Sequence, residues 1–407
     1  MFYVSRGSVP HKRHTQHRGP DGSLYAEELF GVEGFVGRSS LLYHAVPPTR
    51  THRIEAVGPV ALEEADDGVH RHRLINTAAL PPTGDAITGR VPLFFNADVV
   101  MGVVRPAAAM PETTMYRNGE ADEMLFVHEG EGQFESVFGS LRYRPGDYLV
   151  IPIGTTWRLV PDAGSGQRML WLECPSEVEP PKRYRNEYGQ LLEHAPYSQR
   201  DIRVPDQVPA RTDAGDYQLL VKARGRLTAY YYATHPFDVV GWDGYLWPYI
   251  FNIGDFEPIT GRVHQPPPVH QTFQAHNVVV CSFVPRKFDY HPLAIPAPYN
   301  HSNINSDEVI YYVAGNFMSR RGVDISSFTL HPAGIPHGPH PGTVEASIGR
   351  EATEELAVMV DTFRPLRLTR QAADLDDDRY PYSWLPPADA SSEAADLVER
   401  GPEAFPD

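Results

Sequence analysis

Short runs in which apolar and polar residues alternate recur along the whole chain. A period of two is typical of strands that bury one face. It predicts strands within five segments: 133–143, 147–152, 218–221, 277–284 and 309–313. Helix signals are sparse, and the best short helical turns are predicted at 26–29 and 354–358. The pattern therefore predicts a mainly β protein with long loops and few short helices.

Composition supports this class and narrows the partners. Thirty-nine prolines and 33 glycines among 407 residues favour a loop-rich chain, long enough for two core-bearing domains. The net charge of −16 offers nucleic acid no broad electrostatic support. Two cysteines make no disulfide framework, and no apolar run approaches the roughly 18 residues of a membrane helix. The start of the chain also lacks a signal-peptide apolar region. We therefore expect a cytoplasmic protein without nucleic-acid or membrane partners.

One pattern of residues occurs twice, about 180 to 185 residues apart. The two copies read Tyr116-x-Asn118-x4-Glu123-x6-Gly130 and His301-x-Asn303-x4-Glu308-x6-Gly315. A Pro-x-Gly-x2 element follows each copy and ends at Trp157 in the first and at His337 in the second. Glycine and proline at fixed places are typical of tight turns between strands. The repeat predicts two barrel units of the same kind.

The two copies differ where a metal could bind. Two neutral imidazoles and one carboxylate can hold a divalent ion on one side and leave its other side open. The second copy supplies this set as His301, Glu308 and His337, whereas the first has aromatic residues at both histidine positions. We expect a metal in the second barrel only, and a hydrogen-bonded Glu123 in the first. The alternative is that both histidines are satisfied core side chains, and their joint loss upstream weighs against it.

Further histidines lie near this set in the sequence. His264 and His270 stand at the two ends of a rigid proline-rich loop at 266–268. His331 lies close enough to His337 to contact a substrate or to orient a metal ligand. Three N-terminal histidines among basic residues are more typical of a solvated arm than of a metal site: His11, His14 and His17.

With these residues in place, the chain resembles a known family, the homogentisate 1,2-dioxygenases. The resemblance is carried by LYAE at 24–27, SLLY at 40–43, PYNHSN at 298–303 and PHGP at 336–339. Longer stretches, such as HPFDVVGWDG and FEPITGRVHQPPPVHQ, are similar to the shorter actinobacterial-type members. The resemblance covers most of the chain, though unevenly.

The resemblance and the repeat together predict three regions. We expect an N-terminal β domain at 1–255, with a degenerate cupin barrel at about 110–165. A catalytic cupin barrel at 256–370 and an acidic, partly disordered tail at 371–407 are expected to follow. The resemblance also implies a homo-oligomer, a trimer or a hexamer.

The resemblance implies Fe(II) as the cofactor, with His301, Glu308 and His337 as its ligands. Some members place the acid one residue closer to the first histidine, where this chain has Asp307. The glycine spacing shared with the upstream copy favours Glu308. The family's acid–base histidine falls on His264.

This chain has the family's residue types at only some of the substrate positions. Tyr299 matches a family tyrosine that contacts substrate, and His331 matches a further histidine of the site. Departures occur at His44 and Ser302, where the family has arginines, and at Phe317, where it has a tyrosine. We nevertheless include His44 and Phe317 among the predicted substrate-binding residues. The departures leave the ring substituent open.

The resemblance implies an extradiol-type dioxygenase that incorporates both atoms of O2. It would open the ring of a small aromatic dihydroxy acid, homogentisate, to give maleylacetoacetate in tyrosine and phenylalanine catabolism. Arg286, Lys287 or Arg320 could hold the substrate carboxylate. Two alternatives stay open: the same cleavage of another hydroquinone such as gentisate, or a non-oxidative metal cupin that isomerises or binds its ligand.

Overall fold

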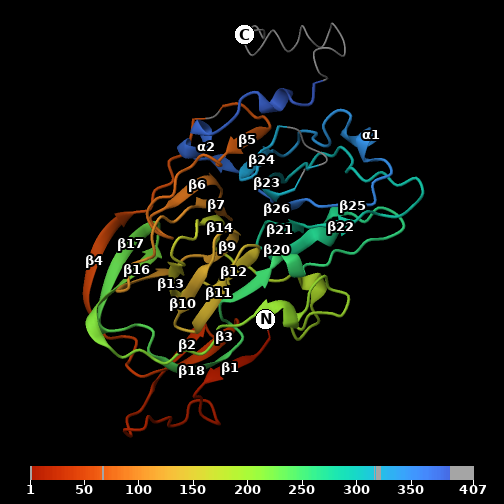
Figure 1. Ribbon diagram of the computed structural model, residues 1–407. Helices are drawn as coiled ribbons and strands as arrows, with labels where there is room; N and C mark the ends of the chain where they lie inside the picture. The colour runs from red at the N-terminus through yellow and green to blue at the C-terminus, as the bar shows by residue number, and fades with distance from the viewer. Residues whose placement is uncertain (1, 67, 316, 318–321, 386–407) are drawn as a thin grey trace. The chain divides into compact units, whose positions relative to one another are not determined.

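The protein is mainly β, as predicted (Figure 1). The computed structural model describes residues 2–66, 68–315, 317 and 322–385. Much of the predicted disordered tail therefore lies outside the described residues. Among the described residues, no helix is long and apolar enough to cross a membrane.

Contacts divide the chain into two compact units. Unit 1 comprises Met1–Glu64, Leu80–Glu257 and Phe273–His276. Unit 2 comprises Ala65–Ala79, Pro258–Thr272 and Asn277–Asp407. The N-terminal region expected at 1–255 thus loses the stretch around 65–79 to unit 2. The reason is strand pairing, because β5 (Arg73–Asn76) forms an antiparallel ladder with β24 (Ser327–His331).

Unit 1 is built from three sheets and a few short 3-10 turns. The first sheet has the order β1 (Val4–Gly7), β18 (Val239–Gly244), β3 (Ser39–His44), β2 (Ala26–Gly31). The second runs β11 (Gly139–Tyr143), β10 (Gly132–Ser136), β13 (Thr156–Pro161), β8 (Thr114–Asn118), β16 (Ala214–Ala223), β17 (Arg226–Thr234), β4 (Thr51–Pro59). The third runs β15 (Ile202–Arg203), β19 (Tyr249–Asn252), β12 (Asp147–Ile151), β9 (Asp122–Glu129), β14 (Arg168–Cys174), β7 (Val100–Val104), β6 (Arg90–Phe95). The 3-10 turns are η1 (Lys182–Tyr184), η2 (Gln199–Asp201) and η3 (Ile253–Asp255). The main core draws buried apolar side chains from both the second and the third sheet.

Unit 2 centres on one sheet. Its order is β20 (Gln271–Ala275, of which the first two residues belong to this unit), β21 (Val278–Phe283), β26 (Leu356–Thr362), β23 (Asp307–Ala314), β24, β5. A two-stranded ladder joins β22 (Arg286–Lys287) to β25 (Ala352–Thr353). The remaining elements are η4 (Pro267–His270), α1 (Thr343–Ser347), β27 (Arg367–Leu368), α2 (Arg370–Asp374) and η5 (Tyr380–Tyr382).

All five segments predicted as strands contain strands, whereas both predicted helical turns are wrong. Residues 26–29 lie in β2, which pairs with β3. Residues 354–358 run into β26, which lies between β21 and β23 and buries Ala357–Val360. Residues with a good helix propensity adopt strand conformation here, because pairing with neighbouring strands outweighs a weak local preference for helix.

Glycines of the sequence repeat adopt matching backbone conformations in the two units. Gly130 and Gly315 have φ of 92° and 97°, and Gly154 and Gly334 have φ of 83° and 80°. Residues with a Cβ rarely take up this left-handed conformation, so the repeat preserves turns that need glycine. At Gly315 a Cβ would also lie 2.7 Å from the backbone oxygen of Glu354, between β25 and β26.

An aspartate that directly precedes the glutamate of each copy also recurs in its role. Asp122 accepts hydrogen bonds from two loop N–H groups, at 2.8 and 2.9 Å. Asp307 accepts two as well, both at 2.7 Å. Each aspartate ties two loops to the start of its strand. Neighbouring residues on a strand point to opposite faces, so the side chains of the adjacent Glu123 and Glu308 lie on the other face of the strand from these aspartates.

Candidate metal centre

His301, Glu308 and His337 converge in unit 2, as the spacing predicted. One ligand atom from each lies within 4.8 Å of the others. The Nε2 atoms of His301 and His337 lie 3.5 and 3.4 Å from the two carboxylate oxygens of Glu308. Asp307 is committed to backbone N–H groups. The carboxylate of this cluster is therefore Glu308.

The backbone holds the two histidines together. His301 and His337 exchange two hydrogen bonds, with N···O distances of 2.8 and 2.9 Å. Each ring donates from Nδ1 to the carbonyl oxygen two residues before it, at 3.3 and 3.4 Å. Both Nε2 lone pairs are thus directed at the cluster, and Nε2 of His337 is buried without a hydrogen-bond partner. Such a pair of oriented, unprotonated nitrogens suits a metal ion.

His331, predicted to bind substrate, lies behind Glu308 instead. It is fully buried, and its Nδ1 lies 2.8 Å from Oε1 of Glu308. Its Nε2 lies 3.1 Å from the hydroxyl of Tyr380. Burial alone would raise the pKa of Glu308, but the imidazoles of His301, His331 and His337 around it hold this pKa well below its usual range. The carboxylate is therefore ionised and oriented by His331.

A second carboxylate faces Glu308 and was missed in the sequence. Asp361 on β26 is directly opposite Glu308 on β23. Its Oδ1 is buried and has no hydrogen-bond partner among the described residues. Burial and the nearby charge of Glu308 raise its pKa to about 8. The repeat contained a signal for it, because Glu173 faces Glu123 in the same way in unit 1.

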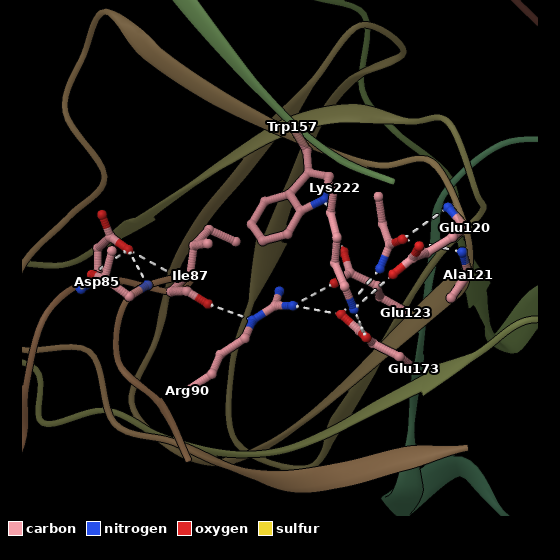
Figure 2. A network of polar contacts seen from close by, with 12 residues as sticks. Asp85, Ile87, Arg90, Glu120, Ala121, Glu123, Trp157, Glu173 and Lys222 are labelled. Carbon is pink, nitrogen blue, oxygen red and sulfur yellow. Dashed lines mark hydrogen bonds and ion pairs between the residues drawn. The ribbon is translucent and has the colours of Figure 1, made fainter. Parts of the chain in front are cut away.

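Unit 1 shows how such a pair of carboxylates is neutralised without a metal (Figure 2). Arg90 donates to Glu123 at 2.6 Å and to Glu173 at 3.0 Å, and Lys222 pairs with Glu173. The indole N–H of Trp157 lies 3.3 Å from Glu123. The prediction that Glu123 is hydrogen-bonded is confirmed.

Among the described residues of unit 2, no lysine or arginine pairs with Glu308 or Asp361. Buried anions need a partner cation. Two imidazole nitrogens and carboxylate oxygens match the ligands of a divalent first-row metal. The residues present therefore fit a metal ion, which would supply the charge that Arg90 and Lys222 supply in unit 1.

A cavity of about 500 Å³ adjoins the cluster and is mostly apolar. His264, Tyr299 and Phe317, predicted for catalysis and substrate contact, all line it together with His301 and Glu308. The rings of His264 and Tyr299 lie 5.1 Å apart. His264 also has Nδ1 3.6 Å from a carboxylate oxygen of Asp289.

Two other histidines have clearly shifted pKa values. His270 lines the same cavity, and burial lowers its pKa to about 3, so it is neutral. His44, predicted to bind substrate, lies in unit 1 and does not line this cavity. Its ring nitrogens lie 2.7 Å from Asp238 and 2.9 Å from Glu28. Burial lowers its pKa, but these hydrogen bonds outweigh burial and raise it to about 9.

Several known proteins are similar to this chain. The chain is 42% identical to a Saccharolobus solfataricus protein named "Putative dioxygenase", over 94% of this chain and 99% of that one. It is 27% identical to a homogentisate 1,2-dioxygenase of Nitrobacter hamburgensis over 64% of this chain, a region spanning 61% of that protein. Residues 96–253 match the N-terminal region of homogentisate 1,2-dioxygenase. A solved cupin barrel protein from Leptotrichia buccalis shares 11% identity over 74% of this chain and all of its own, with a TM-score of 0.32.

The mainly β fold and its histidine–glutamate cluster define a β protein with a candidate metal site. The high identity over nearly the whole length of the Saccharolobus solfataricus relative goes further. The chain belongs to the same family as that "Putative dioxygenase", and its residues 96–253 match the N-terminal region of homogentisate 1,2-dioxygenase.

Proposed function

We propose that this protein is an iron(II)-dependent dioxygenase that opens the ring of a hydroquinone-type aromatic acid. Homogentisate is the first candidate substrate, and maleylacetoacetate would be its product. The observation that carries the proposal is the convergence of His301, Glu308 and His337 at one side of the cavity. Iron(II) held there would supply the chemistry that lets an electron-rich ring react with O2, which is otherwise spin-forbidden.

His264 is the proposed base. It lines the cavity, and its side chain is half exposed, so the imidazole can reach a ligand. Histidine is the side chain whose ordinary pKa best suits proton transfer near neutrality. It would take the proton from the ring hydroxyl that faces the metal ligands. Asp289, 3.6 Å from Nδ1, would stabilise the resulting imidazolium.

The other walls would position the ring and keep water away. Tyr299 stands beside His264 and offers a hydroxyl to the substrate. Phe317 packs edge-on against Tyr312, with ring centroids 4.5 Å apart, and both line the cavity. An apolar wall strengthens electrostatic interactions with the few polar groups that remain.

Oxygen uptake by iron(II)-reconstituted protein tests the proposal. We expect uptake coupled to ring-fission absorbance with homogentisate, and less or none with gentisate. His337→Ala should abolish iron binding and uptake, because one of three ligands is lost, and leave the β fold intact. His276→Ala, an exposed histidine of unit 1, is the matched control and should change neither.

Three outcomes would contradict it. Full turnover without oxygen would favour a metal isomerase. Failure to bind iron after anaerobic purification would favour a binding protein. Faster uptake with gentisate would retain the reaction class and replace the substrate.

A further inference from the structure

One arginine in the cavity wall makes no ion pair with a carboxylate among the described residues. Arg286 on β22 lines the cavity and is half-buried. Its Nη1 donates to the backbone oxygen of Lys287 at 3.1 Å, and its guanidinium lies 5.5 Å from the ring centre of Phe288. No ion pair joins it to a carboxylate anywhere in the described parts of the chain. One of five N–H donors is thus used.

Fully buried charges are normally paired, and a half-buried guanidinium that makes no ion pair keeps donors within reach of a ligand. Burial lowers the pKa of Arg286, while the charges of Asp289 and Glu355 raise it. An arginine stays protonated throughout the physiological range. The cavity therefore contains a fixed positive charge with unused donors, arranged in the fork that suits a carboxylate.

The remaining charges of the cavity wall have the opposite sign. The other acidic groups that line it, with histidines between them, are Asp289, Glu308, Glu355 and Asp361, the last of which has a pKa raised to about 8. An anionic ligand would be repelled along most of this wall and attracted at Arg286. Arg286 would therefore decide which end of an asymmetric ligand points toward the histidine–glutamate cluster.

The structure also separates Arg286 from the other basic residues near the site in sequence. Lys287 is exposed and does not line the cavity. Arg320 lies outside the described residues. On these grounds we propose that Arg286 is the anion-binding subsite of the cavity. It would select aromatic ligands that bear a carboxylate and fix the orientation of their ring relative to His301, Glu308 and His337. The proposal rests on the proposed function for the identity of the ligand's ring.

Binding, measured separately from turnover, tests the subsite. Iron(II)-loaded protein would be titrated calorimetrically without oxygen, once with homogentisate and once with methylhydroquinone, in which a methyl replaces the carboxymethyl group. We expect the native protein to bind the acid more tightly. Arg286→Gln should weaken binding of the acid about 10- to 100-fold, because charge-assisted hydrogen bonds are lost. The affinity for methylhydroquinone should stay unchanged. Arg286→Lys should recover part of the loss.

Lys287→Gln removes the same charge one residue away and should bind both ligands like the native protein. The subsite is refuted if Arg286→Gln binds the acid as tightly as the native protein, or if both variants weaken it equally. A variant that loses affinity for both ligands would also refute it, because the arginine would then support the wall. Carboxylate-dependent binding without oxygen uptake would leave the subsite standing and overturn the proposed function.

Discussion

Arg90 offers the sharpest test of the charge argument, because it pairs with both carboxylates of unit 1, whereas no described lysine or arginine pairs with Glu308 or Asp361. Its side chain is 9% exposed, and those of Glu123 and Glu173 are 1% and 3% exposed. Arg90→Met would remove the guanidinium and keep most of the apolar volume. Glu173 would retain Lys222, but Glu123 would keep only the indole N–H of Trp157.

Removing one partner from a buried ion pair costs about 3–5 kcal/mol, because the other charge stays buried. For a unit of this size, each kcal/mol shifts the midpoint of thermal unfolding by roughly 2–4 °C. We therefore expect Arg90→Met to lower it by about 6–20 °C. Adding Glu123→Gln should recover most of the loss, since a neutral amide replaces the stranded carboxylate.

Calorimetric and chemical denaturation of the three proteins would measure this. Arg142→Met is the control, because Arg142 pairs with Glu131 and Asp162 at the surface, where such pairs contribute about 0–1 kcal/mol. Equal losses for Arg90→Met and Arg142→Met would refute the reasoning. So would a double variant no more stable than Arg90→Met alone.

Three further outcomes follow from individual side chains. The pKa of His44 is raised to about 9, so its protonation contributes about 3 kcal/mol to the free energy of unfolding below pH 6.5, and this contribution is lost as pH rises through 9. The free energies of unfolding of the native and His44→Gln proteins, measured by denaturation, should therefore converge by pH 10. His270 has a pKa lowered to about 3, so native stability should fall by up to about 4–5 kcal/mol between pH 6.5 and 3, and His270→Phe should lose less. Gly338→Ala should weaken metal binding at least tenfold in chelator competition, because its Cβ would lie 2.2 Å from the side-chain oxygen of Asn300 and displace His337. Unchanged metal affinity would refute this, because it would show that the turn accommodates the Cβ without moving His337.

The convergence of His301, Glu308 and His337 could be predicted because the sequence repeat supplied its own comparison. His301 and His337 stand where the first copy has Tyr116 and Trp157, and a difference at two coupled positions marks a change of chemistry. The strands could be predicted because alternation of apolar and polar residues is a local feature of the sequence. Asp361 was not predicted, because it meets Glu308 only through the pairing of β23 with β26. The register between two strands that are distant in sequence cannot be read from either strand alone.

His331 and His44 show a second limit. Sequence proximity and family resemblance placed both near substrate, yet which way a ring faces depends on partners far along the chain. His331 is held by Glu308 and Tyr380, and His44 by Asp238. The predicted turn at 26–29 failed similarly, because β3 decided its conformation.

The reciprocal backbone hydrogen bonds between His301 and His337 have a consequence for maintenance of the enzyme. The two candidate ligands are joined by main chain and keep their spacing without an ion between them. A metal ion bound there would then leave and be replaced without any refolding. Chelation should accordingly be reversible many times over, unlike in small domains that unravel when stripped of zinc.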